Sequence, residues 1–261
     1  MELKDKLLNA AAPVTFFEMV PPAEGQPEGV ARCVEEVGRI RALADAINLP
    51  EIRDENRGEA RTFKFIPRVE PRGLASRIAQ ETGAEVLINR GVVYDAEPLT
   101  WFRETCERFQ VETVALVGGE SSRLKYPGPS VLEAAEQVRA AGLPLTLGGI
   151  TIPSRRGEAE RIRRKNAAGL IFFTTQVLFD SNDIVGLVQS LNGLESRILL
   201  SFAPVSQPGD LEFLRWLGVD IPRNLDQFLF QRGPSADGPQ QAEPADSALA
   251  RSLDIAQRTL L

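Results

Sequence analysis

Residues 113–175 read TVALVGGESSRLKYPGPSVLEAAEQVRAAGLPLTLGGITIPSRRGEAERIRRKNAAGLIFFTT. Short apolar runs in this stretch alternate with longer runs of helical spacing, and runs of this length are typical of buried strands. The strands are predicted at Thr113–Val117, Leu145–Gly149 and Leu170–Thr175, and the helices at Ser130–Ala141 and Glu158–Ala168. A strand, a helix and a further strand in that order predict parallel strands joined by right-handed crossovers.

The same alternation continues on both sides of this stretch. Further strands are predicted at Val14–Val20, Ala44–Leu49, Thr62–Val69, Glu85–Asn89 and Arg197–Phe202. The remaining helices are predicted at Pro27–Leu43, Gly73–Thr82, Glu97–Phe109, Asp183–Leu191 and Gly209–Leu217. Eight strands, nearly all followed by a helix, within 261 residues favour a (β/α)8 TIM barrel over an open doubly wound sheet. No G-x-G-x-x-G motif follows a strand, which also argues against an open dinucleotide-binding sheet.

The composition changes toward the end of the chain. We assign residues 1–231 to the barrel. Residues 232–247 are rich in Gly, Pro, Asp, Gln and Ala, which predicts a flexible linker. Residues 248–261 return to helical spacing, and we expect a C-terminal helix that is able to dock on the barrel.

Charge and hydropathy exclude several classes of protein. A net charge of −6 argues against a general nucleic-acid binder, which usually carries a basic face. The charged segment Met1–Pro13 lacks the apolar core of a signal peptide, and no run approaches the roughly 20 apolar residues of a membrane helix. We therefore expect a cytoplasmic protein. Cys33 and Cys106 are too few and too isolated for a disulfide framework or a zinc site, and we interpret them as free thiols.

The chain contains no histidine. This removes the usual general base, the commonest metal ligand and every Ser-His-Asp triad. Acid–base chemistry must then use Glu, Asp, Lys, Tyr or Cys, and we predict no metal site.

Two candidate catalytic residues stand at the carboxyl ends of predicted strands, where active sites of such barrels lie. Glu18 ends an apolar strand in FFEMVPP, and burial would raise its pKa toward the range that suits a general acid. The alternative is a glutamate that faces solvent or pairs with an arginine. Gln176, in TTQVLFD, carries a planar amide that matches the donor and acceptor edge of a pterin. It is equally able to cap backbone groups of a neighbouring element.

Other strand ends supply candidates for cofactor binding. Asn48 is able to hydrogen-bond a cofactor edge, although its charged loop suggests solvation. Arg68 is suited to a phosphate or carboxylate, and a surface salt bridge is its alternative. The segment Asn89–Arg90 has the same ambiguity.

The predicted strand Thr113–Val117 and the predicted helix Glu158–Ala168 provide the remaining candidates. Gly118 and Gly119 allow a ligand to approach the backbone closely, and Glu120 follows them, although glycines here are also ordinary turn residues. Tyr126 is able to stack on an aromatic ligand or to cover the rim. Lys165 belongs to a basic helical run and can reach a phosphate, whereas most such runs are solvated.

Several of these segments, in this order, resemble the methylenetetrahydrofolate reductase family over roughly residues 14–230. The strongest are Phe17-Glu18-Met19-Val20-Pro21-Pro22, similar to the family's F-E-F-F-P-P, and Lys165 to Asp180, with Lys165, Ala168-Gly169, Thr175-Gln176 and Phe179-Asp180 at the family's spacing. Weaker support comes from Ala115 to Glu120, Ile150 to Pro153, Ala203-Pro204-Val205 and Gly218 to Pro222.

The resemblance implies an FAD-containing barrel that uses NAD(P)H to reduce 5,10-methylenetetrahydrofolate to 5-methyltetrahydrofolate. It implies that Glu18 is the general acid that helps to open the methylene bridge. It also implies that Gln176 contacts the folate and that Lys165 contacts the phosphate region of the flavin.

The chain departs from the family's pattern at the flavin. Arg68 stands where the family usually has a histidine, and Val117-Gly118-Gly119-Glu120 stands in place of R-G-D, so that Glu120 replaces the acidic residue only after a shift of one position. Two alternatives stay open: direct hydride transfer from the nicotinamide without flavin, and a non-catalytic folate-binding subunit of a larger complex. The expected partners are a small folate and either a second copy of the chain or another protein, with neither nucleic acid nor a membrane.

Overall fold

The computed structural model describes residues 2–9, 11, 13–55, 61, 63–119, 124–180, 182–230 and 245–260. Its strands are β1 Phe16–Glu18, β2 Ala46–Pro50, β3 Val86–Gly91, β4 Thr113–Val117, β5 Thr146–Thr151, β6 Leu170–Val177 and β7 Arg197–Ser201. Its helices are α1 Leu3–Leu8, α2 Pro27–Ile40, α3 Pro71–Thr82, α4 Pro98–Glu107, α5 Val131–Ala140, α6 Glu158–Ala167, α7 Asn182–Ser190, α8 Pro208–Trp216, α9 Leu225–Phe230 and α10 Ala245–Leu260, with the short 3-10 helix η1 at Val92–Tyr94.

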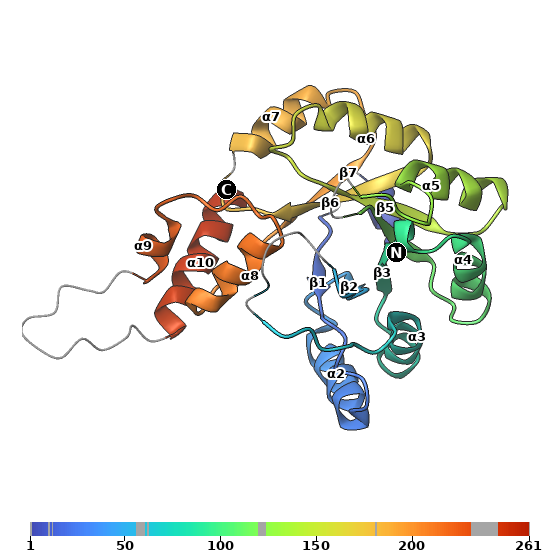
Figure 1. Ribbon diagram of the computed structural model, residues 1–261, viewed down its shortest axis with the longest axis horizontal. Coiled ribbons are helices and arrows are strands. Elements are labelled where there is room, and N and C mark those ends of the chain that lie inside the picture. The colour runs from blue at the N-terminus through green and yellow to red at the C-terminus, as the bar shows by residue number, and fades with distance from the viewer. Residues whose placement is uncertain are drawn as a thin grey trace, which may run out of the picture.

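All strands of the described sheet are parallel and pair in sequence order from β1 to β7. The sheet curls, and helices α2 to α7 surround it on the outside (Figure 1). This arrangement confirms the predicted α/β barrel of the TIM type. Among the described residues no helix is long and apolar enough to cross a bilayer.

One predicted strand is wrong. The segment predicted at Thr62–Val69 contributes only an isolated antiparallel bridge between Ala23 and Arg68, and β2 pairs directly with β3. The Phe63 ring packs edge-on against Phe213 and Trp216 of α8, at centroid distances of 5.3 and 5.1 Å. The described part of this segment, residue 61 and residues 63–69, therefore packs against α8 and the chain after β1. Within the described residues the sheet has seven strands rather than eight.

Alternate side chains of the strands belong to separate apolar clusters. The outer cluster packs the sheet against the helices and includes Ile47, Leu49, Ile88, Val114 and Leu116. The inner cluster fills the barrel with Ala46, Leu87, Ala115, Phe172 and Leu199, joined by Leu3 and Leu7 of α1. Helix α1 is tied to the strands because Lys6 pairs with Asp45 and the Lys6 carbonyl accepts from Arg197 at 3.1 Å. Helix α1 therefore covers the inner side chains at the amino ends of the strands.

A close contact inside the barrel gives a test of this packing. A Cβ placed on Gly148 of β5 would lie 2.2 Å from Cζ of the fully buried Phe172 ring. We expect Gly148→Ala to lower the free energy of unfolding by about 1–3 kcal/mol, because the ring must move within a filled core. The matched control is Gly186→Ala in α7, where a Cβ meets nothing within 4 Å and alanine should stabilise the helix by about 0.5–1 kcal/mol. Urea unfolding measures both, and a Gly148→Ala protein as stable as wild type would contradict the packing.

The helices after β7 form a separate cluster beside the barrel (Figure 1). Its buried side chains are Val205, Leu211, Leu214, Val219, Leu225 and Leu229. Helix α10 begins at Ala245 rather than 248 and joins this cluster, with the Ser252 hydroxyl accepting from the Val205 amide at 3.0 Å. Most of the expected linker, residues 232–244, lies outside the described residues.

Candidate active site at the carboxyl ends of the strands

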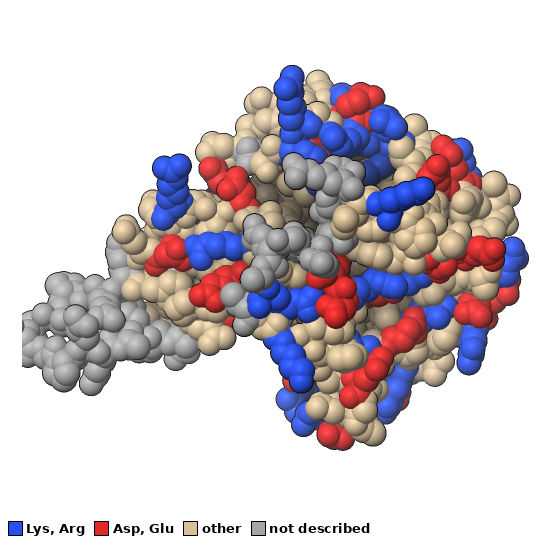
Figure 2. Space-filling view, viewed as in Figure 1, with Lys and Arg blue, Asp and Glu red and all other residues tan. Residues whose placement is uncertain are grey.

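Polar side chains replace apolar ones where the inner face of the barrel reaches the carboxyl ends of its first strands. Phe16 belongs to the inner cluster, so strand alternation turns Glu18 to the same side. In the same way Asn48 follows the inner residue Ala46, and Asn89 follows the inner residue Leu87. The face of the molecule seen in Figure 2 is hollowed near its centre, over the strands labelled in Figure 1, and basic and acidic side chains are intermixed around the hollow.

The predicted residues Glu18 and Asn48 are in direct contact. Asn48 Nδ2 donates a hydrogen bond of 2.8 Å to Glu18 Oε2, across the paired strands β1 and β2. Desolvation by the surrounding protein raises the pKa of Glu18, and the hydrogen bond from Asn48 offsets part of that rise. Glu18 is nevertheless exposed to solvent. Protein surrounds the side chain on most sides, but water reaches it from the open side of the mouth. A carboxyl group with a raised pKa that water and ligands can reach is suited to donate a proton.

Two amide oxygens at this mouth lack partners. Asn48 is 5% exposed, and its Oδ1 atom has no hydrogen-bond partner among the described residues. The same holds for Oδ1 of Asn89, one strand further along. The sequence identified both residues at strand ends, but only the fold shows that their oxygens are buried and unpaired.

Gln176 is engaged with a neighbouring element. Its Nε2 donates a hydrogen bond of 3.1 Å to the carbonyl of Leu217, directly after α8. This contact corresponds to the structural alternative for Gln176, in which the amide caps backbone groups. Among the described contacts, nothing joins Gln176 to the Glu18–Asn48 pair.

The glycine pair after β4 is covered by an aromatic side chain. A Cβ on Gly119 would lie 2.2 Å from Cζ of Tyr126. The Tyr126 ring therefore leaves room only for glycine at this position. A Cβ on Gly118 would meet only Val131, at 3.7 Å. Tyr126 in turn packs edge-on against Tyr94 at 5.5 Å, which places it over the ends of β3 and β4. Glu120 lies outside the described residues.

Lys165 sits between α6 and the sheet. Its Nζ donates a hydrogen bond of 2.7 Å to the carbonyl of Ile150, and burial lowers the pKa of its amine. The nearby Glu158 is 2% exposed, and its Oε1 accepts from the Thr151 hydroxyl at 2.9 Å and from the Ile152 amide at 3.2 Å. Nothing in the sequence around Glu158 distinguishes it from the exposed acidic residues of a first helical turn, so its burial could not be predicted.

Arg68 lies beside the chain that leaves β1. Its backbone forms the bridge to Ala23, and its guanidinium donates a long hydrogen bond of 3.5 Å to the carbonyl of Pro21. The residue is half-buried and lies on the same side of the barrel as the exit from Glu18.

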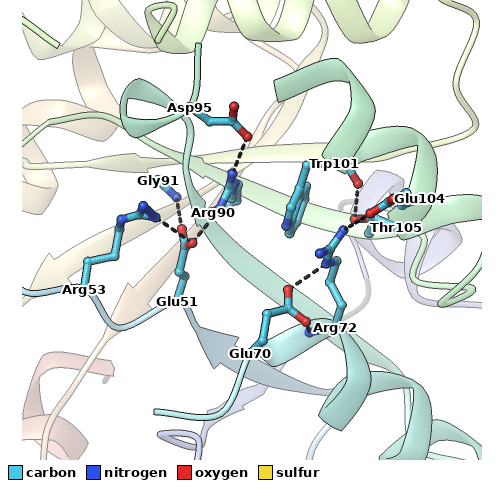
Figure 3. A network of polar contacts seen from close by, with 10 residues as sticks. All are labelled: Glu51, Arg53, Glu70, Arg72, Arg90, Gly91, Asp95, Trp101, Glu104 and Thr105. Atoms are coloured by element: carbon cyan, nitrogen blue, oxygen red, sulfur yellow. Dashed lines mark hydrogen bonds and ion pairs between the residues drawn. The ribbon is translucent and has the colours of Figure 1, made fainter. Parts of the chain in front are cut away.

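A buried ionic network supports the loops that follow β2 and β3 (Figure 3). Arg90 is 6% exposed and donates to Glu51 at 2.5 Å and to Asp95 at 2.8 Å. Glu51 also accepts from the Gly91 amide at 3.0 Å and from Arg53 at 3.0 Å. Arg90 was a candidate from the sequence, but only the structure shows that its partners Glu51 and Asp95 lie on the loops after β2 and β3.

Trp101 of α4 lies between two arginines at the edge of this network (Figure 3). The guanidinium carbons of Arg90 and Arg72 lie 4.7 and 5.0 Å from the centroid of the nearby indole ring. Arginine over an aromatic face is a favourable cation–π contact. The network therefore anchors the mouth to the outer layer of helices.

Two of the residues predicted to bind a cofactor have contacts within the protein, and Glu120 lies outside the described residues. The Lys165 amine is bonded to the Ile150 carbonyl, and the Tyr126 ring occupies the space over Gly119. Among the described residues there is also no group of three or more Cys, Asp or Glu side chains that could hold a metal ion.

The chain matches no protein-family model and no curated protein. It is similar in structure to a chain of the tryptophan synthase complex from Pyrococcus furiosus, with 11% identity and a TM-score of 0.50 over 78% of this chain and 83% of that chain. It is also similar to oxaloacetate acetylhydrolase in complex with oxalate, with 13% identity and a TM-score of 0.51 over 81% of this chain and 76% of that chain. At these identities the likeness shows the barrel fold alone.

Proposed function

We propose that this protein reduces 5,10-methylenetetrahydrofolate to 5-methyltetrahydrofolate with NAD(P)H, and that Glu18 is the general acid. The observation that carries the proposal is the Glu18–Asn48 pair. It places a carboxyl group of raised pKa at the open end of the barrel, within 2.8 Å of an amide that fixes its position. The resemblance of the FFEMVPP segment to the reductase family supports the same role.

The proposed reduction needs a proton donor at N10 of the folate. Protonation of N10 lets the methylene bridge open to an iminium at N5, and a hydride added to the methylene carbon then gives the methyl group. Glu18 supplies the proton to N10 and is reprotonated from water, so that each turnover consumes one hydride and one proton. Positioned acids of this kind contribute about 10²–10⁴-fold to a rate.

We infer that the hydride comes directly from the nicotinamide. The support is that two residues predicted to bind a cofactor already have contacts within the protein: Lys165 Nζ donates to the Ile150 carbonyl, and the Tyr126 ring lies against Gly119. No step of the proposed reaction is therefore assigned to FAD.

An activity assay combined with an absorption spectrum tests this proposal. We expect a colourless protein that oxidises NADH or NADPH when methylenetetrahydrofolate is added. A yellow protein with a flavin band would replace direct transfer with the FAD route. If tetrahydrofolate binds but neither nicotinamide nor flavin donors support reduction, the alternative of a folate-binding subunit is correct instead.

The pH dependence gives a sharper prediction about Glu18. Because the protonated acid is the active form, kcat/KM should fall as the pH rises through the pKa of Glu18. The hydrogen bond from Asn48 lowers that pKa, so Asn48→Leu should raise it and move the descending limb to higher pH. Asn89→Leu is the control, since it leaves the bond between Glu18 and Asn48 in place. A limb that stays fixed in Asn48→Leu would mean that Glu18 is not the titrating acid.

A further inference from the structure

We propose that Asn48 and Asn89 recognise the ligand through their two buried amide oxygens, which accept hydrogen bonds from an N–H-bearing edge of the pterin ring. This rests on the proposed function for the identity of the ligand. The site itself is defined by its atoms: Asn48 Oδ1 and Asn89 Oδ1 are buried and have no partner among the described residues.

Both side chains are on the inner face of neighbouring strands. In the pairing of β2 with β3, Asn48 lies opposite Leu87 and Pro50 lies opposite Asn89. Asn89 is therefore two residues closer to the mouth than Asn48. Leu87 is an inner residue and Ile88 an outer one, and alternation returns Asn89 to the inside. Glu18, Asn48 and Asn89 therefore follow one another along three adjacent strands, directly above the apolar layer.

Neither amide oxygen makes a hydrogen bond within the described residues that the fold could depend on. The inner positions below them hold Ala46 and Leu87, and an apolar residue at either place would extend that layer. A buried acceptor without a donor loses its contact with water and gains nothing within the protein. Unsatisfied polar groups of this kind are typical of functional sites.

The chemistry of the oxygens selects the ligand. Amide oxygens are acceptors only, so they repel phosphates and carboxylates and require donors. A reduced pterin carries N3–H beside its 2-amino group, which supplies two adjacent donors on a planar edge. The nicotinamide carboxamide offers a single amino group together with an acceptor oxygen, which suits a pair of acceptors less well.

Calorimetric titration of the full chain with tetrahydrofolate tests the proposal. Asn89→Leu keeps the branched shape of the side chain and removes the acceptor, and we expect it to weaken tetrahydrofolate binding about tenfold. Asn89→Asp keeps an acceptor oxygen and should restore most of the affinity. The control is Asn182→Leu, at an exposed position of α7. Binding of NADH, and of p-aminobenzoylglutamate, which lacks the pterin ring, should be unchanged in all of these variants.

The unfolding temperature of the ligand-free protein separates recognition from structure. A recognition role predicts that Asn89→Leu is no less stable than wild type, because the lost oxygen had no partner. A structural role predicts a loss of stability with no change in tetrahydrofolate affinity, and that result would overturn the proposal. A loss of NADH affinity with unchanged tetrahydrofolate affinity would overturn the pterin assignment.

A modified ligand tests the same contact even if the Asn89→Leu protein fails to fold. A tetrahydrofolate analogue whose 2-amino group is replaced by methyl should bind wild type about tenfold more weakly than tetrahydrofolate. Equal binding of the two ligands would overturn the proposal. If wild type binds tetrahydrofolate in this manner but shows no turnover, the proposed reaction fails and the recognition stands. If turnover is present and Asn89→Leu changes neither affinity nor KM, the recognition fails and the reaction stands.

Discussion

Glu18→Gln is expected to lower turnover by about 10²–10⁴-fold, because glutamine fills the same space but has no proton to give to N10. Tetrahydrofolate binding should change little, since the amide still accepts the hydrogen bond from Asn48. Steady-state assays with saturating methylenetetrahydrofolate measure the effect. Glu24→Gln is the matched control: it changes an exposed carboxylate six residues further along the chain and should leave turnover as it is. Full activity in Glu18→Gln would remove the acid from the mechanism.

Glu18→Gln lowers turnover, but it should raise the stability of the protein relative to wild type as the pH increases. A carboxyl group whose pKa is raised on folding stabilises the protein fully below its unfolded pKa and loses that contribution as the pH rises through its folded pKa. Since the pKa of Glu18 is raised, Glu18→Gln should gain stability relative to wild type as the pH increases from acid to neutral. Urea unfolding at acidic and at neutral pH gives the difference, and a difference that does not depend on pH would show that folding leaves the pKa of Glu18 unchanged.

Hydrophobic patterning predicted most of the fold because it reports burial, and burial is what a parallel barrel imposes on its strands. It was wrong at Thr62–Val69 for a physical reason. Phe63 and Phe65 alternate like strand residues, but Phe63 packs on α8 and the Arg61 guanidinium lies over both rings. An alternating pattern shows that side chains are buried without showing which element buries them.

The sequence predicted where the candidate site lies in the fold, but it did not predict which side chains contact one another there. Glu18 and Asn48 were each identified as strand ends, but their hydrogen bond joins residues 30 positions apart. Lys165 and Gln176 show the converse, because each has a backbone partner, Ile150 or Leu217, that no local pattern indicates. Asn89 was ambiguous for the same reason: whether an amide is satisfied depends on neighbours that only the assembled barrel supplies.

The buried arginine behind the mouth gives the largest expected effect on stability. Arg90→Leu keeps an apolar stem against Trp101 but leaves Glu51 and Asp95 without their shared cation. Removing one member of a buried ionic network leaves uncompensated charge, and we expect the free energy of unfolding to fall by about 3–5 kcal/mol.

The control for Arg90 is an arginine in an exposed ion pair. Arg103 of α4 lies 3.9 Å from Glu107 with half of its side chain in solvent, and Arg103→Leu should cost about 0–1 kcal/mol. Urea unfolding of both variants at neutral pH measures the difference. An Arg90→Leu protein within about 1 kcal/mol of wild type at neutral pH would mean that the network is no stronger than a surface pair, and that the loops after β2 and β3 are held by packing instead.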